Sequence, residues 1–199
     1  MLYEIRERFE KLSIIVGRLF GNIPLTPNQW TILSLLPAMA SAYYLAQSEF
    51  LIAAGLFVVA AFMDLIDGSV ARVTGRVSKF GAYLDTIVDR YVEALIVLAL
   101  LFVAIPPLFG LDAKIWLFIY FFGAMMTTYA KAAAKEKDLV KTEIKGGLLE
   151  RAERLILLFI GILLATVSIS YLGYVVVLLA ALANLSALQR ILKAKKAGR

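Results

Sequence analysis

The chain of 199 residues is 61% hydrophobic and 18% charged, and its mean hydropathy of +0.82 excludes an ordinary soluble domain and indicates an integral membrane protein. The formal net charge of +6 suits attraction to a membrane surface and to phosphate groups, and so apolar a chain is not expected to bind nucleic acid. Cysteine and histidine are both absent, which excludes thiolate metal sites and leaves a carboxylate as the base near neutral pH.

Residues 1–25 are expected to form a juxtamembrane amphipathic helix. Their apolar side chains recur at helical spacing among charged ones, at Leu2, Ile5, Phe9, Leu12, Val16 and Leu19. This pattern predicts a helix in the cytoplasmic interface of the membrane, although a helix that packs against the rest of the protein fits it equally well. Thr26 and Pro27 then resemble a helix N-cap followed by proline at the first helical position.

Residues 26–192 are expected to form a bundle of six transmembrane helices, since each apolar segment has about the 20 residues needed to cross a bilayer. The predicted spans are Asn28–Ala46, Phe50–Arg72, Phe80–Ile105, Ile115–Ala134, Glu150–Val167 and Tyr171–Leu192. The fifth span is the least regular because its first turn is charged. The prediction is therefore an all-α, polytopic membrane protein with one domain, residues 1–199, that ends in a basic tail at residues 193–199.

The distribution of basic residues predicts the orientation of this bundle. Of the 21 Lys and Arg residues, all except Lys114 lie at or near the side shared by the two termini and the loops after the second and fourth spans. By the positive-inside rule, both termini and the active site are expected on the cytoplasmic side of the cell membrane.

Two pairs of aspartates lie at the end of the second span and the start of the third. Asp64 and Asp67 are three residues apart, and Asp85 and Asp89 are four apart, so each pair shares one helix face. Ionised carboxylates beside such apolar segments are costly unless they are paired, hydrated or bound to metal. Clustered carboxylates would repel one another, and divalent cations are their natural counter-charge. The alternative is a pair of surface helix ends with solvated aspartates.

The residues around the aspartates also follow a pattern. Gly68 and Ala71 leave a smooth helix surface on which a ligand can approach the backbone, although tight packing of small residues between helices would explain their spacing too. Arg90 and Glu93 are placed to pair across one helical turn. Arg76 and Lys79 are interpreted as positive-inside residues outside the site.

The spacing D-x2-D-G-x2-A-R-x8-G-x3-D-x3-D is met without departure at Asp64, Asp67, Gly68, Ala71, Arg72, Gly81, Asp85 and Asp89. This run resembles the signature of the CDP-alcohol phosphotransferases, integral-membrane enzymes that make phospholipid head groups. Because the signature is long, gapless and chemically mixed, it is specific. The family precedent implies a homodimer.

The resemblance implies a two-metal site that neutralises the pyrophosphate of a CDP-linked lipid. Asp64, Asp67 and Asp85 are the expected primary ligands, and Asp89 is expected to share the second ion and to act as general base on the acceptor hydroxyl. Two Mg²⁺ ions are expected, with Mn²⁺ as a substitute, because every ligand is an oxygen. The hydroxyl oxygen would attack the phosphorus nearest the lipid, and CMP would leave.

The resemblance also implies which residues contact the CDP-lipid. The expected set is Thr26, Pro27, Asn28, Gln29, Gly68, Ala71, Arg72, Ser78 and Gly81. In this set Arg72 is expected to contact the donor phosphate or to orient a carboxylate, and Gly81 to permit close approach of the third span. Helix capping alone would explain Thr26 and Pro27.

Cations also recur at the cytoplasmic ends of the last three spans. The segments Thr128–Lys131, Glu150–Leu155 and Gln189–Arg190 resemble those of the phosphatidylinositol-phosphate synthase branch, whose archaeal relatives use CDP-archaeol. The resemblance implies myo-inositol 1-phosphate as acceptor. The expected phosphate-binding residues are Lys131, Arg154 and Arg190, with Thr128 and Arg151 as lesser candidates. The alternative is that these cations anchor the helix ends at the membrane interface.

Two other functions fit parts of the sequence. A phosphatidylglycerol-phosphate synthase would use glycerol 3-phosphate, which also carries a phosphate. A divalent-cation transporter could use membrane carboxylates, but it should show charged or interrupted segments at midspan, where this chain is apolar. The donor is either CDP-diacylglycerol or CDP-archaeol, since lipid tails would contact generic apolar surfaces.

Overall fold

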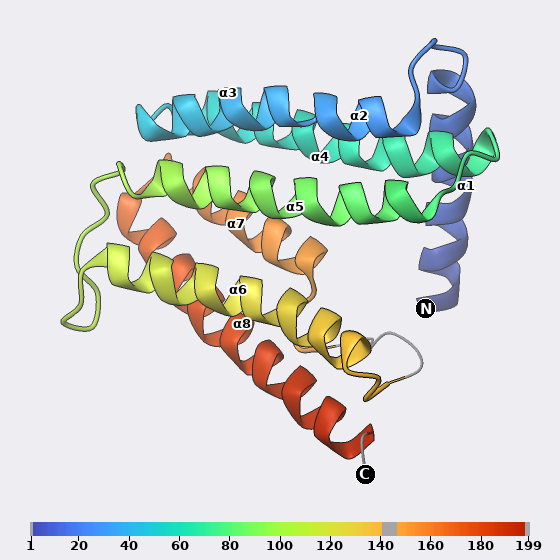
Figure 1. Ribbon diagram of the computed structural model, residues 1–199. Helices are drawn as coiled ribbons and strands as arrows, with labels where there is room; N and C mark the ends of the chain where they lie inside the picture. The colour runs from blue at the N-terminus through green and yellow to red at the C-terminus, as the bar shows by residue number, and fades with distance from the viewer. Residues whose placement is uncertain (1, 141–146, 198–199) are drawn as a thin grey trace. The chain divides into compact units, whose positions relative to one another are not determined.

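The computed structural model describes residues 2–140 and 147–197, with side chains from Lys11 onward. The described part of the chain is helical and contains no β-strand, which confirms the predicted all-α class. Figure 1 shows the helices: α1 Leu2–Phe20, α2 Pro27–Leu33, α3 Leu35–Ala46, α4 Phe50–Val73, α5 Lys79–Leu100, α6 Ala113–Glu136, α7 Arg151–Ala165 and α8 Ile169–Ala197. Met1 and the last two residues of the predicted basic tail lie outside the described residues, and α8 includes the rest of that tail.

The first predicted span consists of two helices instead of one. α2 ends at Leu33 and is capped by Ser34. The Ser34 N–H bonds to the carbonyl groups of Trp30 and Ile32, and its hydroxyl group donates to the carbonyl of Thr31. Pro37 has no N–H to donate to the carbonyl four residues earlier, so it is tolerated only in the first turn of a helix. The chain therefore starts a new helix, α3, two residues before this proline.

Other boundaries also differ from the prediction: α1 ends at Phe20, and α6 and α8 extend beyond their predicted spans at both ends. Two of the differences have a clear local cause. α5 ends at Leu100, and the N–H groups of the next three residues bond three residues back as the chain tightens before Pro106. α7 begins at Arg151, one residue after the predicted start. Glu150 is its N-cap, and the Glu150 N–H donates to the Glu153 carboxylate at 2.7 Å. These two charged residues therefore cap the start of the helix.

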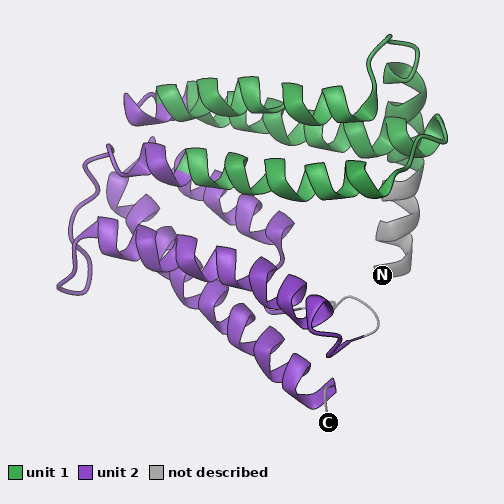
Figure 2. Cartoon of the chain, viewed as in Figure 1, with its two compact units in different colours: residues 1–44, 52–96 green, residues 45–51, 97–199 purple. Residues whose placement is uncertain are grey.

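The chain divides into two compact units (Figure 2). The first consists of residues 1–44 and 52–96, and the second of residues 45–51 and 97–199. In the first unit, Val16 of α1, Trp30 of α2 and Ile66 and Val70 of α4 form a buried apolar cluster. Phe20 packs against it with its ring edge toward Trp30. This cluster joins the N-terminal helix to the helices that carry the predicted site.

In the second unit, close approach of helices depends on glycine. A Cβ atom added at Gly123 of α6 would lie 2.5 Å from the Asn184 amide nitrogen of α8, which bonds to the backbone carbonyl of Ile119 at 2.8 Å. One added at Gly161 of α7 would lie 3.0 Å from Val175 of α8. These contacts fix α6 and α7 against α8.

Two of the described helices, α4 and α8, are both long enough and apolar enough to cross a bilayer. The remaining predicted spans, the interfacial position of α1 and the sidedness of the chain stay predictions.

Candidate active site

Three of the four predicted aspartates meet in the first unit. One carboxylate oxygen from each of Asp64, Asp85 and Asp89 lies within 4.8 Å of the others, and all three side chains are shielded from solvent to some degree. Asp64 comes from the C-terminal half of α4, and the other two come from successive turns of α5. Because like charges at this separation repel, and because carboxylate oxygens are the ligands that hard cations prefer, this cluster fits a divalent metal ion.

Asp67, the fourth aspartate, lies one turn after Asp64 on α4 and has a different environment. Its side chain is buried, and it accepts a 2.6 Å hydrogen bond from the hydroxyl group of Thr31 on α2. It is close enough to Asp64 and Asp85 to interact with their charges. The predicted ligand set is thus gathered in one place, with Thr31 orienting one of its members.

A pocket of about 360 Å³ lies beside these carboxylates. It is lined by Pro27, Asn28, Thr31, Asp67, Gly68, Ala71, Arg72, Arg76, Val77, Ser78, Gly81, Ala82 and Asp85. All of the residues predicted at the CDP-lipid line it except Thr26 and Gln29. Arg76, which sequence reasoning left outside the site, also lines it, and nothing in its local pattern distinguishes it from an ordinary positive-inside residue.

Thr26 and Gln29 do not line the pocket but begin the helix that does. The Thr26 N–H donates to the Gln29 side-chain oxygen at 2.7 Å, and the Gln29 N–H donates to the Thr26 hydroxyl group at 3.3 Å. Together they form a capping box at the start of α2. Their position favours the capping role, and direct contact with a nucleotide stays a prediction.

Small residues shape two walls of the pocket. The three atoms nearest to a Cβ added at Gly68 all belong to the guanidinium group of Arg72, at 3.4 Å or more, so this glycine leaves room for a ligand instead of packing against a neighbouring helix. A Cβ at Gly81 would lie 3.1 Å from the Asn28 side-chain oxygen, which shows that the start of α5 closely approaches α2. Ser78 caps α5 by accepting from the Gly81 N–H at 2.9 Å.

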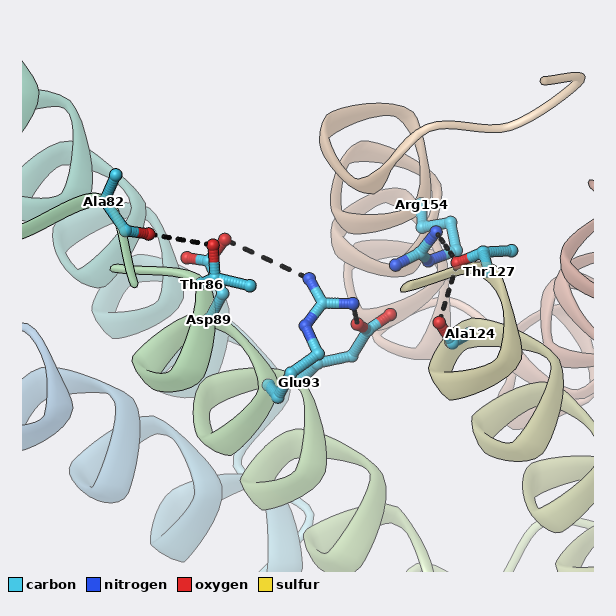
Figure 3. Close-up of polar contacts among 8 residues, drawn as sticks. Ala82, Thr86, Asp89, Glu93, Ala124, Thr127 and Arg154 are labelled. Atoms are coloured by element: carbon cyan, nitrogen blue, oxygen red, sulfur yellow. Dashed lines mark hydrogen bonds and ion pairs between the residues drawn. The ribbon is translucent and has the colours of Figure 1, made fainter. Parts of the chain in front are cut away.

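Asp89 has charged neighbours on its own helix. Arg90 lies 4.0 Å from a carboxylate oxygen of Asp89 and 3.2 Å from one of Glu93, so the predicted pairing of Arg90 with Glu93 is present. Glu93 is fully buried. Seven residues before Glu93 in the same helix, Figure 3 shows Thr86 bonded to the backbone of Ala82, an interaction within α5 alone. Asp89 therefore lies next to the Arg90–Glu93 ion pair of its own helix.

In the second unit, two of the predicted acceptor residues meet at one threonine. Arg154 of α7 is 1% exposed, and its guanidinium group lies 3.4 Å from the hydroxyl group of Thr127 on α6 (Figure 3). Arg190 of α8 is 8% exposed and donates a 2.7 Å hydrogen bond to the Thr127 carbonyl. Thr127 thus links two buried cations that lie 36 residues apart in the chain. Sequence reasoning missed Thr127 and named its neighbour Thr128.

The other predicted acceptor residues are partly buried on the same helices. Lys131 lies four residues after Thr127 on α6, which places both on one helix face. Thr128 follows Thr127 directly, and Arg151 begins α7. The spacing of Thr127 and Lys131 is the one signal in the sequence that could have identified Thr127.

Comparison with known proteins agrees with this geometry. The family model of the CDP-alcohol phosphatidyltransferases matches residues 24–186. The chain is 33% identical to the archaetidylinositol phosphate synthase of Pyrococcus horikoshii over 98% of its own length and 97% of that protein. It is 31% identical to the phosphatidylinositol phosphate synthase of Corynebacterium glutamicum over 78% and 71% of the two chains.

Solved structures of the Mycobacterium tuberculosis phosphatidylinositol phosphate synthase have the same fold. The form with CDP-DAG bound has a TM-score of 0.80 at 24% identity and covers 92% of this chain and 94% of that one. The form in complex with manganese and citrate has a TM-score of 0.79 at 26% identity and covers 92% and 88% of the two chains. The chain belongs to the CDP-alcohol phosphatidyltransferase family.

Proposed function

We propose that this enzyme transfers a phosphatidyl-type group, diacylglycerol phosphate or archaeol phosphate, from a CDP-lipid to a hydroxyl group of myo-inositol 1-phosphate and releases CMP. The observation that carries the proposal is the position of the aspartate cluster beside a pocket built from the family signature. The relatives named above are synthases of archaetidylinositol phosphate and phosphatidylinositol phosphate, and these names support the choice of acceptor.

The donor site lies in the first unit. Asp64, Asp67, Asp85 and Asp89 are the proposed ligands of two divalent ions, Mg²⁺ with Mn²⁺ as a substitute, since their donor atoms are all oxygens. When bound, the ions would neutralise the pyrophosphate and stabilise charge on the departing CMP. The manganese complex of the mycobacterial relative supports the use of divalent metal.

The nucleotide is proposed to occupy the pocket next to these ligands. The exposed backbone at Gly68 and Ala71 allows close approach, and Arg72 supplies a planar cation for the donor phosphate. Asn28 and Ser78 offer polar side chains at the opposite wall. Thr26 and Gln29 would act by starting α2 in the correct place.

Asp89 is the proposed general base. It would accept the proton of the inositol hydroxyl group as that oxygen attacks the phosphorus nearest the lipid. The bond between this phosphorus and the oxygen of CMP breaks, and the electron pair leaves with CMP. The Arg90–Glu93 pair beside Asp89 restricts the position of its carboxylate.

The phosphate of the acceptor is proposed to bind at Arg154, Arg190 and Lys131, with Thr128 and Arg151 as further candidates. An arginine that anchors a helix at the membrane interface extends its charged end into water. Arg154 and Arg190 are instead buried, and both bond to Thr127. This burial favours a binding role over an interface anchor.

The two alternative functions, a phosphatidylglycerol-phosphate synthase and a cation transporter, are supported to different degrees. Glycerol 3-phosphate stays the alternative acceptor, because a cationic site would bind its phosphate as well. A cation transporter is disfavoured, since the matched family consists of transferases; the carboxylates lie in the C-terminal half of α4 and the N-terminal half of α5.

The proposal also covers the membrane location, topology and assembly of the enzyme. We place the enzyme in the cytoplasmic membrane with six spans, both termini inside, an interfacial α1 and a basic tail that contacts anionic lipid. One functional domain is proposed because the family match passes through both compact units. The assembly is proposed to be a homodimer.

Steady-state kinetics with a panel of substrates tests this assignment. Purified enzyme in detergent is given CDP-diacylglycerol or CDP-archaeol with myo-inositol 1-phosphate, glycerol 3-phosphate or free inositol. We expect the highest kcat/KM with myo-inositol 1-phosphate. A higher value with glycerol 3-phosphate would replace the proposed acceptor, and saturation by free inositol at the same concentration as its phosphate would contradict the phosphate-binding role of the arginines.

A further inference from the structure

The N-terminal helix contacts the donor pocket through one serine. Ser13 of α1 is buried, and its hydroxyl oxygen accepts hydrogen bonds from Arg72 Nη2 at 2.7 Å and from Arg72 Nε at 3.2 Å. Arg72 belongs to the family signature and lines the pocket. The contact joins positions 59 residues apart, so the sequence pattern gave no sign of it.

The hydrogen-bonding capacity of this group is used in full. A serine hydroxyl has one hydrogen and two lone pairs. Besides accepting from Arg72, the Ser13 hydroxyl group shares a 2.9 Å hydrogen bond with the hydroxyl group of Ser69 on α4, in which either oxygen can be the donor. Ser69 is itself buried and lies 3.5 Å from Arg72 Nη2. The two serines therefore bind one edge of the guanidinium group.

The backbone of α1 is fixed where this contact is made. A Cβ added at Gly17, one turn after Ser13, would lie 2.5 Å from both the Ser69 carbonyl oxygen and a Val73 methyl carbon. No other residue type permits so close an approach of α1 to α4. The register of the two helices is therefore set next to Arg72, and the Ser13 hydroxyl has little freedom to move away.

Arg72 is in this way held before any ligand binds. A guanidinium group carries five N–H donors in a rigid plane, and the serines engage only the Nε and Nη2 edge. The Nη1 and Nη2 atoms lie 3.4 and 3.6 Å from the position of a Cβ at Gly68 in the pocket wall, and Nη1 takes no part in the contacts with the two serines. An arginine held in this way loses less conformational freedom when it binds an anion.

We propose that Ser13 is a positioning residue for the donor. It holds one edge of Arg72 so that the opposite edge reaches a phosphate oxygen of the CDP-lipid, and α1 is thereby a working part of the donor site. This inference rests on the proposed function, because it takes the ligand of Arg72 to be that phosphate.

The first test separates substrate binding from turnover in three variants. Ser13→Ala removes the hydroxyl group, and Ser13→Thr keeps it. Ser41→Ala is the matched control, because Ser41 is also buried in the same unit and, among the described residues, its hydroxyl bonds to the Ala53 carbonyl at 2.8 Å and not to an arginine. We expect Ser13→Ala to raise the KM for CDP-lipid about five- to tenfold and to leave the acceptor KM unchanged. Ser13→Thr should recover most of the loss, and Ser41→Ala should leave both KM values at the wild-type level.

The second test asks whether Ser13 acts through Arg72. Binding of CDP-lipid is measured by thermal stabilisation in Ser13→Ala, Arg72→Ala and the double variant. If Ser13 only positions Arg72, the double variant binds as weakly as Arg72→Ala alone. An equal further loss in the double variant overturns the proposal. It is also overturned if Ser13→Ala leaves the donor KM unchanged or if Ser41→Ala reproduces its effect.

These outcomes are distinct from a failure of the proposed function. If wild-type enzyme releases no CMP from a CDP-lipid with any acceptor, the assignment of the reaction fails. If wild-type enzyme is active and the Ser13 variants match it, the assignment stands and the positioning role alone is lost.

Discussion

The hydroxyl group of Thr31 donates a 2.6 Å hydrogen bond to a carboxylate oxygen of Asp67 and so joins α2 to the metal-ligand face of α4. Both side chains are buried, and Thr31 also bonds to the carbonyl of Pro27 at 3.1 Å within its own helix. A partner of this kind fixes the orientation of a ligand before the metal arrives. Thr31 therefore connects the start of α2 with the preorganisation of the metal site.

The first prediction concerns this bond. Thr31→Val keeps the side-chain volume and removes the hydroxyl group, which leaves Asp67 without its oriented partner. We expect the Mg²⁺ concentration for half-maximal activity to rise about 10- to 100-fold, the usual effect of losing such a partner. The measurement is a magnesium titration of CMP release.

Thr86→Val is the control for this titration. Thr86 lies on α5 near the cluster, but in the described part of the chain its hydroxyl group bonds to the Ala82 carbonyl of the same helix and not to an aspartate. Its titration should match that of wild type. An unchanged titration in Thr31→Val would show that Thr31 serves the packing of α2 and not the metal site.

The second prediction concerns the base. Asp89→Asn keeps the shape of the side chain but cannot accept a proton, so CDP-lipid should still bind while kcat falls by at least about 10²-fold. Single-turnover kinetics with saturating donor and acceptor, together with donor binding by thermal stabilisation, measure the two effects separately. A kcat near the wild-type value would assign the base to another residue.

The donor site was more predictable from sequence than the acceptor site, and the reason is local. Asp64 and Asp67 lie on one helix turn, and Asp85 and Asp89 on another, so helical periodicity alone groups each pair. Thr127 contacts Arg154 and Arg190 only because α6, α7 and α8 pack together, and its four-residue spacing from Lys131 does not reveal those contacts. Interactions between distant segments were therefore the ones that sequence reasoning missed.

The same distinction applies to the helices. Their approximate positions follow from apolar length, but their number does not, because the first predicted span is divided into α2 and α3 and the third runs past the end of α5. The break at Ser34 arises because Pro37 has no N–H for a helical hydrogen bond. Pro37 is visible in the sequence, but a prediction based on the length of the apolar segment does not take it into account. The contact of Ser13 with Arg72 required the close approach of two helices at Gly17.

The third prediction concerns the acceptor phosphate. Truncation of Arg154 to alanine would remove the proposed charge-assisted hydrogen bond to the acceptor phosphate, a bond expected in both ground and transition states. The acceptor KM should rise by the equivalent of roughly 1.5–3 kcal/mol, and the donor KM should stay close to its wild-type value. Steady-state kinetics with each substrate varied in turn provide both constants. Lower yield or stability with an unchanged acceptor KM would favour an interface anchor.

The fourth prediction concerns Thr127. Thr127→Val removes the hydroxyl group next to Arg154 but keeps the backbone carbonyl that Arg190 contacts. We expect a smaller rise in acceptor KM than in Arg154→Ala, because the cation remains but is less well oriented. Adding Thr127→Val to Arg154→Ala should have little further effect.

A second threonine in the same unit is the matched control. The hydroxyl groups of Thr127 and Thr166 each donate to the carbonyl three residues earlier at 2.7 Å, and Thr166 has no contact with an arginine among the described residues. Thr166→Val should leave the acceptor KM unchanged. An equal effect of the two variants would attribute the loss to helix stability.

Metal-dependent release of CMP tests the central assignment most directly. Wild-type enzyme and Asp64→Ala are incubated in detergent with CDP-lipid and myo-inositol 1-phosphate, with Mg²⁺ or with a chelator, and CMP is quantified. We predict release by wild type only when both the acceptor and Mg²⁺ are present, and none above background by Asp64→Ala, which lacks one of the clustered carboxylates. Release that persists in the chelator, or at the wild-type rate in Asp64→Ala, would contradict a transferase built on this aspartate cluster.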